Sequence, residues 1–163
     1  MKSHLLMMAV ILPVAAAMGG CQDTGEKRHF FDLVDAPKVS VEKVELLDES
    51  DQGVRVAVTV KMTNSNDVPL PMTIANYSVH LSGMGEYRGD QRPQATIPAK
   101  GEQRFVLTAA MAKSPGQTPA TYRAGGNIEY RPPGEFRMLL TESGVPLPTV
   151  SFADSGDLAA AQP

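Results

Sequence analysis

Apolar and polar residues alternate along most of the chain after its first thirty or so positions. The clearest run covers residues 54–63, where four valines and Met62 occupy every second position. Alternation with a period of two predicts a β-strand with one buried face. Shorter runs of the same kind occur at residues 77–82, 105–109, 122–130, 136–140 and 150–152. Residues 39–46 add a further strand, provided that a β-bulge near Glu42-Lys43 brings its two apolar phases together.

Clusters of glycine, proline and asparagine separate these runs, which is typical of turns between strands. No segment shows a sustained helical period, so the sequence predicts an all-β fold. About seven strands in this length indicate an antiparallel β-sandwich of the fibronectin type III or immunoglobulin-like kind. The chain has no tryptophan and one cysteine, which favours the fibronectin type III variant. The residues predicted to face the core are Val54, Val56, Val58, Val60, Tyr77, Val79, Leu81, Phe105, Leu107, Tyr122, Ile128 and Tyr130.

Residues 1–20 have the features of a targeting segment. Lys2 gives a basic start, and an apolar run follows from Leu5 to Met18. This run is shorter than the ~20 residues that a membrane-spanning helix needs, and it fits the apolar part of a secretory signal. The segment Met18-Gly19-Gly20-Cys21 resembles the bacterial lipoprotein processing box, in which the cysteine is lipidated and becomes the new N-terminus. We therefore expect a lipoprotein signal peptide. The alternative is an ordinary signal peptide cut near residues 15–17, which would leave Cys21 as a free thiol.

Lipidation of Cys21 would make the membrane the principal partner of the chain. Two or more acyl chains hold a protein stably at a bilayer without spanning it. In the best-known sorting rule, an aspartate directly after the lipidated cysteine retains a lipoprotein at the inner membrane. This chain has Gln22 at that position. The expected location is therefore the cell envelope, at the outer membrane and facing the periplasm.

The mature chain divides into three predicted parts. Residues 21–36 form a lipidated tether, which would span roughly 20 Å on average if it behaves as a flexible chain. Its apolar residues Phe30, Phe31, Leu33 and Val34 are expected to dock on the domain, although a place near the lipid headgroups is the alternative. Residues 37–152 form the sandwich. Residues 153–163 are small and polar without a pattern, and we expect a disordered tail.

Composition excludes several classes of function. Without Lys2, the mature chain has 14 basic and 18 acidic residues, so it lacks the basic excess of a nucleic-acid-binding protein. One cysteine can form neither an internal disulfide nor a cysteine-rich metal site. The basic residues of the later part could form a face toward anionic lipid or polysaccharide, although protection of the sheet edges is the favoured role. These residues are Arg88, Arg92, Lys100, Arg104, Arg123, Arg131 and Arg137.

Candidate catalytic, metal and cofactor sites are weak in this sequence. His29 and His80 have no neighbouring ligands at the spacing of a zinc site, and no Gly-x-Ser-x-Gly motif supports a catalytic serine. The acidic run at residues 48–51 is the best cation candidate, but it lacks the spacing and the glycine of an EF-hand loop. Gly83-Met84-Gly85 follows a strand without opening a helix, so a hairpin turn is favoured over a nucleotide loop. We expect no catalytic residues, no metal and no cofactor.

One part of the chain resembles a known family. An alternating strand ends at Asn64-Ser65-Asn66, an apolar turn with Pro69 follows, and the next strand runs from Tyr77 to Gly83. This arrangement is similar to the WHy domain (water stress and hypersensitive response) of group 2 late-embryogenesis-abundant proteins, in which a strand ends in Asn-Pro-Asn. Ser65 replaces the family's proline. The resemblance covers roughly residues 37–151.

The resemblance implies a folded, non-enzymatic sandwich that protects cells during desiccation or osmotic stress. It brings no catalytic residues, and the family-motif residues Asn64, Asn66, Pro69, Tyr77 and Gly83 are expected to be structural. Asparagine suits such a turn because its side chain can satisfy local backbone groups. The alternative function is an envelope interaction module, an accessory subunit that binds a protein partner through a sheet face or edge.

Overall fold

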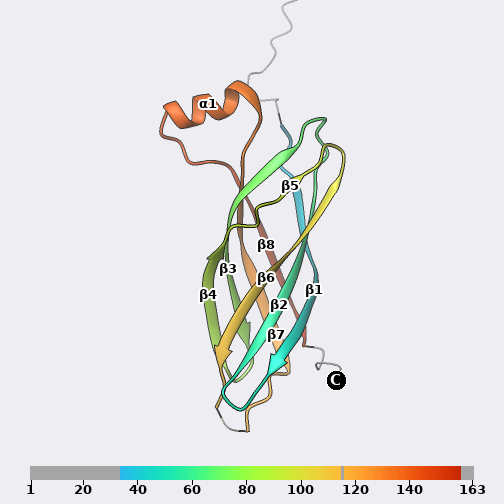
Figure 1. Cartoon of the computed structure of the whole chain (residues 1–163), viewed down its shortest axis with the longest axis vertical. Helices are drawn as coiled ribbons and strands as arrows, with labels where there is room; N and C mark the ends of the chain where they lie inside the picture. Colours follow the sequence, from blue (N-terminus) through green and yellow to red (C-terminus); the bar gives the residue numbers. More distant parts are fainter. Residues whose placement is uncertain (1–33, 115, 159–163) are drawn as a thin grey trace, which may run out of the picture.

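The computed structural model describes residues 34–114 and 116–158, which form a β-sandwich with one short helix (Figure 1). Eight strands lie in these residues. They are β1 (Lys38–Glu49), β2 (Gly53–Thr63), β3 (Leu70–Leu81), β4 (Gly85–Gln91), β5 (Thr96–Ile97), β6 (Glu102–Ala112), β7 (Thr121–Tyr130) and β8 (Thr149–Asp157). Helix α1 (Gly134–Glu142) lies between β7 and β8. The predicted all-β, antiparallel sandwich is confirmed.

The strands form two antiparallel sheets. One sheet has the order β1-β2-β6, and the other has the order β4-β3-β7-β8, with β5 pairing with the start of β3. In an immunoglobulin constant domain the fourth strand joins the sheet of the first two strands. Here β4 pairs with β3 in the second sheet instead.

The first strand contains the predicted bulge. Its pairing with β2 shifts register between Val41 and Lys43, and again between Leu46 and Asp48. A bulge lets one strand contribute residues of both alternation phases to the same face. Val44 and Leu46 are buried in consequence, while Val39 and Val41 pack against the core as partly buried residues.

The core lies between the two sheets. Eleven of the twelve residues predicted to face it are buried, and Tyr122 is half-buried at its margin. Eleven further apolar residues are buried outside that list, and among them Leu70, Met72 and Ile97 lie in segments where the sequence showed no apolar alternation. Strand β5 pairs with the start of β3, and this pairing places Leu70 opposite Ile97.

Residues 136–140 were predicted to be a strand and instead belong to helix α1, so this prediction was wrong. The helix ends in a Schellman motif. The amide of Val145 donates to the carbonyl of Leu140 (3.0 Å), and that of Gly144 donates to Thr141 (3.3 Å). Gly144 has φ of 66°, the left-handed conformation that this cap requires. Gly144 therefore caps a helix, whereas the glycines between the apolar runs were expected to form turns between strands.

Two other predictions need correction. The tail was expected to begin at Ala153, but β8 continues through Asp157 and pairs with β7 up to Thr121. The small residues of this segment occupy an edge strand. Exposed and partly buried positions alternate along it, but the residues there are small or polar, so the sequence shows no hydrophobic alternation. Strand β4 was not predicted, because its sequence of glycine and charged residues is mostly exposed. Residues 1–33 and 159–163, which include Cys21, His29, Phe30 and Phe31, lie outside the described residues.

Candidate functional site

The N-terminal end of the sandwich gathers several segments that are far apart in the sequence. We use this name for residues 34–37, the β2–β3 loop at 64–69, the β5–β6 loop at 98–101, and the α1 region at 134–147. All of them lie at the end drawn at the top of Figure 1, whereas the described chain finishes at the opposite end. The family-motif asparagines are in the β2–β3 loop of this end.

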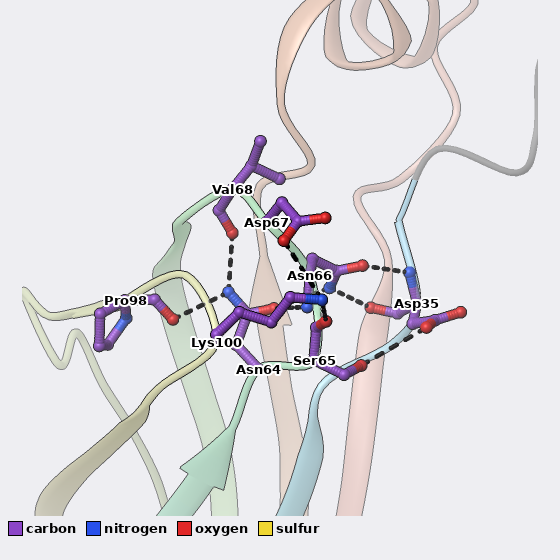
Figure 2. Close-up of polar contacts among 8 residues, drawn as sticks. All are labelled: Asp35, Asn64, Ser65, Asn66, Asp67, Val68, Pro98 and Lys100. Carbon is purple, nitrogen blue, oxygen red and sulfur yellow. Dashed lines mark hydrogen bonds and ion pairs between the residues drawn. The ribbon is translucent and has the colours of Figure 1, made fainter.

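Asn64 is the centre of the loop and is only 1 % exposed. It directly follows β2, and its side chain uses its whole hydrogen-bonding capacity within the protein. Its Nδ2 donates to the carbonyls of Val68 (2.8 Å) and Pro98 (3.1 Å). Its Oδ1 accepts from the backbone amide (2.9 Å) and the side-chain amide (2.7 Å) of Asn66. Asn64 therefore closes its own loop and joins it to the β5–β6 loop (Figure 2).

Asn66 connects the same loop to the start of the described chain. The amide of Asp35 donates to Asn66 Oδ1 (2.7 Å), and Asn66 Nδ2 donates back to the carbonyl of Asp35 (2.9 Å). Figure 2 shows the two residues facing each other at the beginning of the domain. Ser65 adds a long hydrogen bond to the Asp35 carboxylate (3.4 Å). Val34 and Pro37, on either side of this contact, are partly buried and buried respectively. The chain therefore enters the sandwich at a fixed point.

Lys100, in the β5–β6 loop, binds the β2–β3 loop. Its ammonium group donates to the carbonyl of Ser65 (2.7 Å) and lies 3.3 Å from the carboxylate of Asp67. Its backbone amide donates to the carbonyl of Asn66 (2.9 Å). Lys100 has φ of 49°, so its backbone adopts the left-handed conformation. Together these bonds hold three separate segments in one arrangement.

The other family-motif residues lie elsewhere on β3 and its flanks. Tyr77 belongs to the second sheet, and its hydroxyl donates to the carbonyl of Thr108 in the first sheet, so it links the two sheets. Burial is the main cause that raises the pKa of Tyr77 above the ordinary value for tyrosine. Gly83 has φ of 78° in the β3–β4 hairpin turn, which is the turn predicted there. Pro69 is exposed at the start of β3.

A hollow of about 410 Å³ lies where β3 bulges between Met72 and Ile74. Arg92 and Arg131 line it from separate segments, and neither forms an ion pair with another described residue. Glu129 also lines it, with its carboxylate engaged by the hydroxyl of Thr73. Two positive charges and one negative charge give this hollow a basic character. The sequence analysis grouped the two arginines with five other basic residues but could not place them together.

His80 lies exposed on the outer face of the second sheet, beside Ser78, Glu86 and Arg123. A serine, a histidine and a carboxylate occur together here, and these are the residue types used in acid–base catalysis. The carboxylate of Glu86, however, accepts hydrogen bonds from Arg88, and these are the main cause of its lowered pKa. Among the described residues, no hydrogen bond joins His80 to Ser78 or to Glu86. The residues are neighbours without the ordered contacts of a catalytic triad.

The acidic run at residues 48–51 is divided between ion pairs. Asp48 pairs with Arg55, and Glu49 pairs with Lys113. Within residues 34–114 and 116–158, no group of three or more His, Cys, Asp or Glu side chains is placed to hold a metal ion. In the same part of the chain, no helix is long and apolar enough to cross a bilayer.

Some of the remaining basic residues form surface ion pairs. Arg104 binds Glu42 with two hydrogen bonds (2.7 and 3.0 Å), and these are the main cause that lowers the pKa of Glu42. Exposed pairs of this kind contribute little to stability. They do place charge along β1 and β6, which fits the favoured role in protecting sheet edges.

The chain matches no protein-family model and no curated protein. Solved structures do match it. The structural genomics target SoR45 superimposes with a TM-score of 0.52 at 13% identity, over 78% of this chain and 89% of that one. The solution structure of a putative late embryogenesis abundant protein, At2g46140.1, gives 0.52 at 11% identity, over 80% of this chain and 74% of that one. The chain shares the fold of these proteins. AT1g01470 from Arabidopsis thaliana gives a TM-score of 0.47 at 14% identity, over 81% of this chain and 89% of that one.

Proposed function

We propose that this chain is a lipid-anchored, non-enzymatic protein of the cell envelope that protects its surroundings during water loss. The observation that carries the proposal is the fold shared with the late embryogenesis abundant protein At2g46140.1. The family-motif residues of the sequence lie in the same domain, with Asn64 and Asn66 forming the loop that holds its N-terminal end together. The proposal assigns no catalytic role to the Ser78, His80 and Glu86 group, because Arg88 already engages its carboxylate.

Anchoring through Cys21 is the first testable part of this proposal. We expect Cys21→Ala to release the protein from membranes or to leave the precursor uncleaved, because the acyl chains would be lost. The measurement is fractionation of cells together with the intact mass of the purified protein. A variant that partitions and migrates like the parent chain would contradict lipid anchoring.

Protection is the second part, and it is tested separately. A strain that lacks the gene should survive drying and osmotic shock less well, and the parent chain should restore survival. The Cys21→Ala chain, expressed to the same level, shows whether protection needs the anchor. Unchanged survival of the deletion strain would overturn the protective role whether or not the chain is lipidated.

An envelope interaction module remains the second candidate, and edge strand β8 is the reason to keep it. Within the described residues, β8 forms sheet hydrogen bonds with β7 alone, so a partner strand could add to its other backbone edge if it displaced the neighbouring β1. Crosslinking of intact membranes followed by purification would separate the two candidates. One stoichiometric partner favours the module, and a diffuse set of clients favours protection.

A further inference from the structure

We propose that the N-terminal end of the sandwich docks on the bilayer surface through the α1 region, residues 134–147. This inference rests on the proposed lipid anchor at Cys21. It assigns direct contact with phospholipid to the α1 region. Neither the fold likeness nor the family motif implies such a contact.

The first argument is the distribution of exposed apolar side chains. Four large apolar residues are exposed in the described part of the chain, and the two most exposed are both in the α1 region. They are Met138 at 56% and Val145 at 50%. Exposed apolar side chains concentrated in one region commonly mark a surface for a partner or a membrane. Leu140 and Leu147, in the same region, are partly exposed apolar residues.

The second argument is the place where the chain enters the domain. Asp35 is fourteen residues beyond Cys21, and Asn66 fixes it at the same end of the sandwich as α1 (Figures 1 and 2). Random-chain behaviour predicts a mean span of about 20 Å for a tether of this length. The twelve residues of β1 extend for about 40 Å at roughly 3.3 Å per residue. A lipid on Cys21 would therefore bring the α1 end close to the bilayer and leave the opposite end well away from it.

The third argument is a basic hollow that Arg131, three residues before α1, shares with Arg92. Arg131 comes just before α1, and its backbone amide donates to the carbonyl of Pro71 at the start of β3 (2.8 Å). Arg131 and Arg92 line the same hollow, where neither has an ion-pair partner among the described residues. Guanidinium groups bind phosphate well, since they present several donors in a planar fork. Arg137 and Glu142 are both exposed on α1 itself, so the surplus of positive charge lies in the hollow. Phospholipid headgroups supply the anion that this arrangement fits.

The test places one fluorescent probe on the α1 region and a matched one at the far end of the sandwich. The chain has a single cysteine, whose sulfur carries the lipid in the proposed form, so Met138→Cys adds one free thiol. Leu47→Cys is the control, because Leu47 is also apolar and exposed (42%) but lies near the far end of β1. Each full-length variant is purified as the lipoprotein, labelled with a polarity-sensitive fluorophore, and placed in vesicles of phosphatidylethanolamine with a minority of phosphatidylglycerol.

We expect the probe at position 138 to shift to shorter wavelength in vesicles and to be quenched by brominated lipid, whereas the probe at position 47 does neither. Arg92→Gln with Arg131→Gln, in the Met138→Cys chain, should reduce both responses. Circular dichroism of each variant confirms that it is folded. An equal response at positions 138 and 47 would overturn the docking, and an unchanged response in the two-arginine variant would overturn the headgroup contact.

Failure of the anchor gives a different result from failure of the docking. A chain that is not lipidated neither floats with vesicles nor shows the added mass, and the docking proposal then falls together with the anchor. A chain that is lipidated and floats, but shows no response at position 138, leaves the anchor in place and overturns the docking alone.

Discussion

The Asn64 loop offers the sharpest test of how the domain is held together. In Asn64→Asp the side chain keeps its size, but an ionised carboxylate has no proton to donate. The carbonyls of Val68 and Pro98 would then lose their donors and face a negative charge. The two hydrogen bonds from Asn66 to Oδ1 would remain. The substitution therefore removes half of the network without opening a cavity.

The expected cost follows from the burial of this side chain, which is only 1 % exposed. A buried polar group left without its partner costs about 1–3 kcal/mol, so two carbonyls give roughly 2–6 kcal/mol. Domains are stable by only about 5–15 kcal/mol, and one kcal/mol lowers Tm by roughly 4 °C at this size. We expect Asn64→Asp to lower Tm by about 8 °C or more.

The assay is thermal and urea unfolding of residues 22–163, with circular dichroism as the measured signal. Asn127→Asp is the matched control, since Asn127 is exposed and its Oδ1 accepts from Ser151 (2.7 Å), a bond that a carboxylate retains. Only a protonated carboxyl can donate, so the deficit of Asn64→Asp should shrink as the pH falls toward the ordinary carboxyl pKa of about 4. Equal Tm values for the two variants near neutral pH would refute the structural account of Asn64.

Two further predictions concern the second sheet. Gly126→Ala should destabilise the domain by about 1–3 kcal/mol or more in urea unfolding, because a Cβ there would lie 2.2 Å from the backbone oxygen of Asn76. Gly125→Ala, whose nearest neighbour would be 3.3 Å away, should cost clearly less, and equal costs would argue against the close approach. The hydrogen bond to Asp154 (2.6 Å), followed by burial, raises the pKa of Tyr122 to about 12. This contribution to stability is present below the unfolded pKa of about 10 and is lost as the pH rises toward 12. Ultraviolet titration should show the high pKa falling in Asp154→Asn, and an unaltered titration curve would contradict the assignment.

The strands that were predicted from the sequence are those whose burial leaves a clear alternation. Four valines of β2 point into the core and alternate with polar or small residues, so both the strand and its buried face could be read directly. The bulge in β1 could also be inferred, because Val41 and Val44 are three positions apart and a regular strand cannot bury both. Strand β4 has only Tyr87 as an apolar residue at a partly buried position. Its place in the sheet depends on pairing with β3, which leaves no mark on its own sequence.

Helix α1 shows how a short apolar run can be read with the wrong period. Phe136, Met138 and Leu140 are spaced as in a strand, while Phe136 and Leu140 are also spaced as in a helix. Nine residues are too few for periodicity to decide between the two. The stronger signal was Gly144, because a glycine just after an apolar run is a common helix cap.

The candidate site was predictable in its residue types but not in its partners. Asparagines at the end of a strand indicate a turn, and the loop at residues 64–66 forms one. Asn64 reaches Pro98, which is 34 positions away, and Asn66 reaches Asp35, which is 31 positions away. Contacts over such separations depend on how the sheets pack. Local sequence rules therefore could not show that this loop joins the entry of the chain to the β5–β6 loop.

The two asparagines of the loop have different roles, which follow from their different exposure to solvent. Asn64 is buried, and all of its partners belong to the loops that close the end of the sandwich, so its effect is mainly on stability. Asn66 is half-exposed, and its bonds to Asp35 add little to a core that is already closed. Those bonds do fix the direction in which the chain enters the domain. For a protein held by one lipidated terminus, that direction decides which end of the sandwich approaches the bilayer. Under the proposed lipid anchor, a motif without catalytic groups would control function through orientation. The α1 region, which carries the exposed Met138 and Val145, lies at the end that this motif would turn toward the lipid.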